Sequence, residues 1–150
     1  MQYLQDFLNN RILIAALVAW AIAQAIKAIL YTIVNREFKF ERLVGSGGMP
    51  SSHAATVCAL TTAVAMQFGL DSFEFAISFV LSSVVLHDAR GVRQEAGKQA
   101  VTITAIVDHL LKEGKIRELP NWELKELIGH TPLQVLIGSI MGIGIGLWLG

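Results

Sequence analysis

The feature that most restricts the fold of this chain is a set of four apolar segments separated by polar connections. They lie at Ile12–Val34, Ala54–Phe68, Phe73–Leu86 and Leu133–Leu149. As a helix the first would extend about 34 Å, enough to cross a bilayer. Only 16% of the 150 residues are charged, against about 25% in soluble domains. We therefore expect an all-α integral membrane helical bundle, with about four transmembrane helices, as a single domain over residues 1–150.

Net charge and cysteine content limit the partners and cofactors that we expect for this chain. The formal net charge is zero, so we expect no nucleic-acid partner. The only cysteine, Cys58, cannot form a disulfide within the chain or build a cysteine metal site. No cluster of Asp, Glu and His stands at metal-ligand spacing, so we expect no metal and no other cofactor.

The distribution of basic residues predicts the orientation in the membrane. Lys and Arg are concentrated between segments one and two and between segments three and four, whereas the connection after Phe68 has none. Because cytoplasmic loops carry the excess of positive charge, we expect a multi-pass protein whose polar motifs face the cytoplasm.

Two further patterns concern packing. Ala100, Ile103, Val107 and Leu110 recur at helical spacing and predict an amphipathic helix ending near Gly114, followed by a short helix at Trp122–Ile128. Such helices lie on the membrane surface or cover the bundle. In the last segment, glycines recur every four residues, at Gly138, Gly142 and Gly146. They make a smooth face on which another helix can pack, or through which a homo-oligomer can form.

The stretch from Gly45 to His53 combines features of an anion site. Its glycines allow a tight turn that exposes backbone N–H groups, and Ser51 or Ser52 can cap a helix beginning near Ala54. Helix N-termini bind anions, and His53 can transfer a proton near neutral pH. The stretch indicates phosphate chemistry; the alternative is an ordinary glycine-rich turn followed by a capped helix.

Three other places could contribute to the same site. Lys27 shares a helix face with Gln24, Tyr31 and Asn35; it either points inward or extends to the interface. Arg90 and Arg93 could grip one phosphate while Asp88 orients a histidine or an arginine; alternatively, this stretch only binds lipid headgroups.

The third place is the turn that precedes the last segment. Thr131, Pro132 and Gln134 predict a capping box, which puts His130 at a helix N-terminus, as His53 is. Two histidines with cations and hydroxyls suit phosphoryl transfer. One histidine would attack phosphorus and the other would protonate the leaving oxygen.

Three ordered motifs resemble a known family. Gly-Gly-Met-Pro-Ser-Ser-His at 47–53, Asp-Ala-Arg-Gly-Val-Arg at 88–93 with Ala-Gly-Lys-Gln-Ala at 96–100, and Gly-His-Thr-Pro at 129–132 resemble the divergent family related to type-2 phosphatidic acid phosphatases. That family is also described as acid phosphatase and vanadium-dependent haloperoxidase-related. The resemblance implies metal-independent hydrolysis of lipid phosphates or diphosphates, with His53 as the leaving-group acid and His130 as the nucleophile.

At some positions this sequence differs from the motifs of the parent superfamily, the phosphatases to which the divergent family is related. Where its motifs have Asp four residues after the nucleophilic His, this chain has Gln134, so Asp88 would have to replace that carboxylate. Leu124 occupies the place of an Arg. Lys27 and Arg36 are nine residues apart without a following Pro, where the parent motif has Lys and Arg-Pro seven apart.

We expect a lipid phosphate phosphatase that acts at the cytoplasmic membrane face, with membrane lipids as partners and a lipid phosphate as substrate. The alternatives are a non-catalytic protein that binds anionic headgroups and a small transporter component. The candidate catalytic residues are His130, His53 and Asp88. The candidate phosphate-binding residues are Lys27, Arg36, Gly47, Gly48, Ser51, Ser52, Arg90, Arg93 and Lys98.

Overall fold

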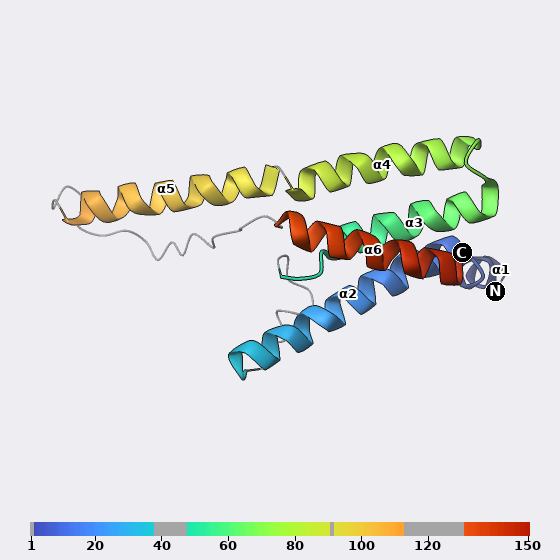
Figure 1. Ribbon diagram of the computed structural model, residues 1–150, viewed down its shortest axis with the longest axis horizontal. Coiled ribbons are helices and arrows are strands. Elements are labelled where there is room, and N and C mark those ends of the chain that lie inside the picture. Colours follow the sequence, from blue (N-terminus) through green and yellow to red (C-terminus); the bar gives the residue numbers. More distant parts are fainter. Residues whose placement is uncertain (1, 38–47, 91, 113–130) are drawn as a thin grey trace.

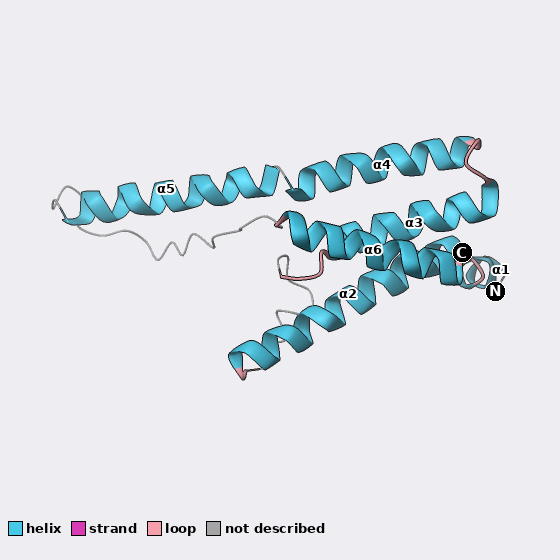
Figure 2. Cartoon of the chain, viewed as in Figure 1, coloured by secondary structure: helices cyan, strands magenta, loops and turns pink. Residues whose placement is uncertain are grey.

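The computed structural model describes residues 2–37, 48–90, 92–112 and 131–150. These residues form only α-helices and short loops (Figure 2), which confirms the all-α prediction. The helices are α1 (Gln2–Leu8), α2 (Arg11–Asn35), α3 (Ser52–Phe68), α4 (Phe73–Arg90), α5 (Val92–Lys112) and α6 (Pro132–Leu149).

Helix ends follow the capping residues in the sequence. The Ser51 side chain accepts a hydrogen bond from the Ala54 amide and begins α3, and Gly69 ends it with φ of 87°. Thr131 caps α6, and Gln134 completes the predicted capping box. Of the two serines considered, Ser51 is the cap.

Helix α3 is the centre of the bundle and contacts α2, α4 and α6. Ser82 donates to the carbonyl of Val57, and Thr61 donates to the carbonyl of Ser78, so α4 runs antiparallel to α3. Gly138, near the start of α6, lies against Ser51, and Gly150, just after its end, lies against Ala63. Helix α6 therefore runs parallel to α3. Figure 1 shows α4 beside α3, while α2 crosses the bundle at an angle. The C-terminal ends of α2 and α4 therefore lie at the same end of the bundle as the N-terminal ends of α3 and α6.

The bundle has small side chains inside and large apolar side chains outside. Alanines of α2 and α3 form most of the core, whereas Phe79 is 56% exposed and Trp148 is 76% exposed. Water would disfavour such a surface, but lipid would not, and helices in lipid associate through small residues. The buried alanines are Ala15, Ala16, Ala19, Ala23, Ala28, Ala54, Ala55, Ala59, Ala63 and Ala89.

Two of the four predicted spans, α2 and α6, are long and apolar enough to cross a membrane. Only 39% of the apolar window in α2 and 22% of that in α6 is buried, whereas the core helix of a soluble protein would be mostly buried. A crossing by α3 or α4 stays a prediction, because both are less apolar than α2 and α6.

The glycine face of α6 packs against α3 of the same chain, which confirms it as a packing face. A Cβ on Gly138 would collide with the carbonyl oxygen of Ser51, and a Cβ on Gly142 would collide with that of Ala55. The partner of this face is the side of α3 that carries Ala55, Ala59 and Ala63. Since α3 fills this face, a homo-oligomer would need a different surface.

Two helices differ from the sequence expectation. Helix α5 begins at Val92, before the first residue of the predicted amphipathic pattern, and it contacts α4. Figure 1 shows it extending away from the bundle rather than covering it. Helix α1 was not predicted, and the predicted helix at Trp122–Ile128 lies outside the described residues.

Candidate functional site

The centre of the candidate site is a buried lysine. Lys27 is 5% exposed, and its Nζ donates to Gln24 Oε1 and to Ser52 Oγ, both at 2.9 Å. Lys27 points inward, so the alternative of extension to the interface is wrong. No carboxylate in the described part of the chain forms an ion pair with it. A buried ammonium bonded only to neutral oxygens retains a capacity to bind an anion.

The loop before α3 brings its backbone to this lysine. Gly48 has φ of 84°, a conformation that favours glycine. A Cβ at Gly48 would lie 3.7 Å from Lys27 Cγ, so the backbone runs beside the lysine side chain. After the cis Met49–Pro50 bond the loop becomes buried, and Ser51 is fully buried.

The beginning of α6 joins the same loop. The Ser51 amide donates to the Gln134 carbonyl oxygen at 3.0 Å, so the first turns of α3 and α6 are held side by side. The Gln134 side chain bonds the Thr131 amide at 3.1 Å, and the Gln134 amide bonds Thr131 Oγ1 at 3.3 Å. Two of the predicted polar motifs therefore meet at their described residues.

The end of α4 reaches the same end of the bundle. Ser82 contacts Val57, and by helix rise Asp88 lies roughly 9 Å beyond Ser82 while His53 lies roughly 6 Å before Val57. Asp88 and His53 are both half-buried, and the His53 Nδ1 atom is shielded from solvent. This arrangement puts a carboxyl and an imidazole near one end of α3.

The predicted serines differ in their availability. Ser52 is 4% exposed and bonds Lys27. The Ser51 hydroxyl already caps α3, with 3.3 Å between its oxygen and the Ala54 nitrogen. Ser51 therefore serves the loop conformation, and Ser52 is the hydroxyl beside the cation.

The structure does not bring every candidate to Lys27. Arg36 is exposed, has a left-handed φ of 53° and follows Lys27 by roughly 13 Å of helix rise. Gly47 and His130 lie outside the described residues. Arg90, Arg93 and Lys98 lie at the end of α4 and along α5, and their side chains are not among the described ones.

The electrostatic character of the described site is positive. Lys27 supplies a full charge, and the first turn of α3 directs backbone N–H groups and the positive end of its dipole toward the same end. Within the described ranges, no three His, Cys, Asp or Glu side chains form a group that could hold a metal ion. A cation, a hydroxyl and helix N-terminal amides are the kinds of group that bind phosphate in proteins.

Sequence reasoning did not name two participants as site residues. Gln24 bonds Lys27, and its position three residues earlier on the same face was the available signal. The Gln134 carbonyl oxygen bonds Ser51, and no sequence pattern indicates a backbone contact between segments so far apart.

The sequence of this chain is similar to those of known proteins. The family described as "Divergent PAP2 family" matches residues 8–145. The chain is 39% identical over 146 residues, covering 92% of both chains, to a Bacillus subtilis (strain 168) protein named "Uncharacterized membrane protein YuiD". No solved structure matches.

Proposed function

This chain belongs to the Divergent PAP2 family, and from that premise we propose that it hydrolyses a lipid phosphate at the cytoplasmic membrane face. The reaction is metal-independent and uses a histidine nucleophile. The substrate is a phosphate or diphosphate ester with a hydrocarbon tail.

One observation carries the proposal. Lys27 is a buried cation without a carboxylate partner among the described residues, and it bonds Ser52 in the first turn of α3. A buried charge is costly unless it is paired. A bound phosphate would supply that pair and would also contact the N-terminal amides of α3.

The chemical roles follow from the family motifs and from the positions of the helices. His130 attacks phosphorus, which forms a phosphohistidine and breaks the bond to the lipid oxygen. His53 donates the proton that this oxygen needs, and water then releases phosphate. Lys27 and Ser52 stabilise the charge on the phosphoryl oxygens, and Asp88 orients a histidine.

A second candidate function is binding of anionic lipid headgroups without catalysis. It is favoured by Gln134, which stands in place of the parent Asp and whose side chain bonds the Thr131 amide. That side chain is used in a helix cap and carries no charge with which to support a histidine nucleophile.

The test is phosphate release from phosphatidic acid, phosphatidylglycerophosphate and an isoprenoid phosphate by detergent-purified protein in EDTA. We expect release that disappears in His53→Ala/His130→Ala. The matched control is His87→Ala/His109→Ala, because both of these histidines are exposed and lie outside the site. The control should retain the wild-type rate.

The other results separate the two functions. Binding of these lipids without release would support the headgroup-binding function. Release only after Mg²⁺ is added would refute the metal-free mechanism, and an unchanged rate in the double histidine variant would remove both histidines from the reaction.

The orientation belongs to the same proposal. Four crossings by α2, α3, α4 and α6 would put the ends that surround Lys27 in the cytoplasm. The alternating directions of consecutive helices support this, as does the basic content of the connections. Single cysteines introduced into a Cys58→Ala background at Asp71 and at Asn35 should react with an impermeant thiol reagent from opposite sides; labelling of both from one side would refute it.

A further inference from the structure

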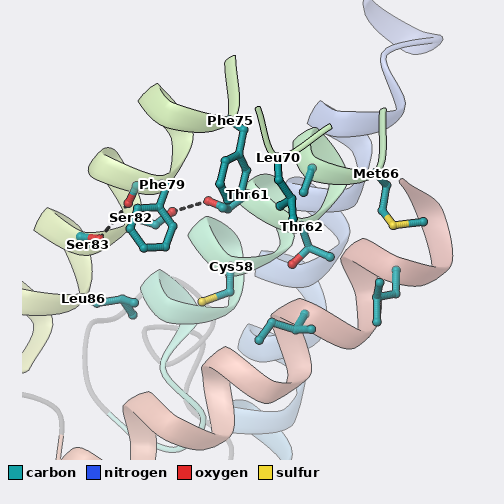
Figure 3. Close-up of a pocket in the computed structure, with 13 residues that line it drawn as sticks. Cys58, Thr61, Thr62, Met66, Leu70, Phe75, Phe79, Ser82, Ser83 and Leu86 are labelled. Carbon is teal, nitrogen blue, oxygen red and sulfur yellow. Dashed lines mark hydrogen bonds between the residues drawn. The ribbon is translucent and has the colours of Figure 1, made fainter. Parts of the chain in front are cut away.

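A pocket of about 400 Å³ lies on α3 between α4 and α6. Figure 3 shows Cys58, Thr61 and Thr62 of α3 facing Phe75 and Phe79 of α4 across this pocket. Helices α4 and α6 contact each other only sparsely, whereas each packs on α3. The pocket is therefore the space that remains between two helices held apart by a third.

The lining of the pocket offers few free hydrogen-bonding groups. Thr61 Oγ1 and Ser82 Oγ lie 2.6 Å apart, and each also bonds a backbone carbonyl, of Ser78 and of Val57 respectively. Ser83 donates to the carbonyl of Phe79 in its own helix. Because these hydroxyls are bonded within the protein, an occupant needs apolar surface rather than polar groups.

The size of the pocket selects one kind of apolar occupant. A helix about 10 Å across would fill roughly 900 Å³ over the 12 Å of helix rise from Cys58 to Met66. The pocket holds less than half of that volume. It could enclose only part of a helix of a second copy, whereas its volume suits one hydrocarbon chain.

The position of the pocket connects it to both the membrane and the candidate site. Its mouth is bordered by exposed apolar side chains, among them Met66 at 60% and Leu147 at 57%, so it opens on the surface that lipid would cover. Along α3 it begins at Cys58, about 7 Å of helix rise beyond His53, and continues away from the site. A chain that enters this pocket from the Lys27 end of the bundle can therefore follow α3 as far as Leu70.

We propose that this pocket binds one hydrocarbon chain of a membrane lipid, and, resting on the proposed function, that this is the chain of the lipid phosphate substrate. The phosphate binds at Lys27 and Ser52 while the chain follows α3 between α4 and α6. The pocket therefore selects for a flexible aliphatic tail, and it explains how a site at one helix end holds a substrate that stays in the bilayer.

The experiment is photo-crosslinking in vesicles, with mapping of the labelled residues by mass spectrometry. The two probes are phosphatidic acid and diacylglycerol, each with a diazirine in one acyl chain. We expect the phosphatidic acid probe to label the pocket side of α3 and α4. Ala65→Phe places a ring in the pocket and should lower this labelling about tenfold, the effect of excluding roughly two methylene groups.

The matched control is Ala76→Phe, because Ala76 is exposed on α4 and does not line the pocket. It should leave labelling within about twofold of wild type, since it displaces no buried methylene group. If Ala65→Phe fails to fold, Ser83→Phe fills the pocket from the exposed side of α4 and should have the same effect.

The two probes separate this inference from the proposed function. Equal pocket labelling by both probes, unchanged in Lys27→Met, would support the chain site and count against phosphate recognition. Labelling spread over the outer faces of α2 and α6, and unaffected by Ala65→Phe, would overturn the chain site whatever the phosphatase assay gives.

Discussion

Replacing Lys27 by methionine should weaken lipid phosphate binding strongly while leaving the fold almost unchanged. Methionine is unbranched and only one atom shorter than lysine, but it lacks the charge and the three donors. The variant therefore separates a role in anion binding from a role in holding α2 against α3.

The magnitude follows from the two bonds that Lys27 makes. Each is 2.9 Å long and charge-assisted, and such bonds contribute about 1.5–3 kcal/mol. Removing the ammonium loses these bonds but also relieves the desolvation of a buried charge, which is several kcal/mol. The two effects oppose each other, so the free energy of unfolding should change by less than about 2 kcal/mol.

For phosphate binding, no comparable gain offsets the loss of the ammonium. One lost charge-assisted contact of about 1.5–3 kcal/mol weakens binding about 10- to 100-fold. The assay is titration of the purified protein with phosphatidic acid in mixed micelles, beside thermal unfolding of the same samples. Lys112→Met is the matched control, since it removes the same charge from an exposed position on α5.

Two results would refute this reasoning. If Lys27→Met bound phosphatidic acid as wild type does, Lys27 would not be the anion-binding group. If the variant lost several kcal/mol of stability together with all binding, and free phosphate did not stabilise wild type, its role would be structural.

Three further changes test the packing and the cap. Gly142→Ala should cost about 1–3 kcal/mol because its Cβ meets the Ala55 carbonyl, whereas Gly144→Ala, where a Cβ meets nothing within 4 Å, should be neutral or stabilising; equal melting temperatures would contradict the close contact. Thr61→Val removes two interhelical bonds and should lower the melting temperature by an amount equivalent to about 0.6–1.7 kcal/mol, more than Ser83→Ala, which loses a bond within one helix. Gln134→Glu keeps the capping box and adds a negative charge at a helix N-terminus, so stability should rise by about 0.3–1 kcal/mol; a lower melting temperature than wild type would contradict this role of position 134 in the cap.

Local sequence rules predicted the parts of the fold that depend on neighbouring residues. Helix caps at Ser51 and Thr131 follow from side chains that reach backbone amides two or three positions away. The packing face at Gly138 and Gly142 follows from a four-residue spacing. For Lys27 the polar residues on its own face left two directions open, inward or toward the interface, and only the structure decided between them.

The features that sequence did not predict depend on contacts between distant segments. The bond from Lys27 to Ser52 joins residues 25 positions apart, and the bond from Ser51 to Gln134 is made by backbone atoms that every residue possesses. The early start of α5 is another case, since its apolar periodicity begins only at Ala100. Helix propensity and apolar periodicity carry no information on contacts between distant segments.

The capping box offers a physical reason for the glutamine that departs from the parent motif. A capping box needs a Glu or Gln at the third helical position, since the side chain must reach back to the amide of the cap residue. Gln134 does this, with 3.1 Å from its Oε1 to the Thr131 amide, and Asp is one methylene shorter. The Gln134 carbonyl also fixes the Ser51 amide. Position 134 therefore holds together the beginnings of α3 and α6. The carboxylate that the proposed reaction needs has to come from another helix, and Asp88 at the end of α4 is the candidate among the described residues.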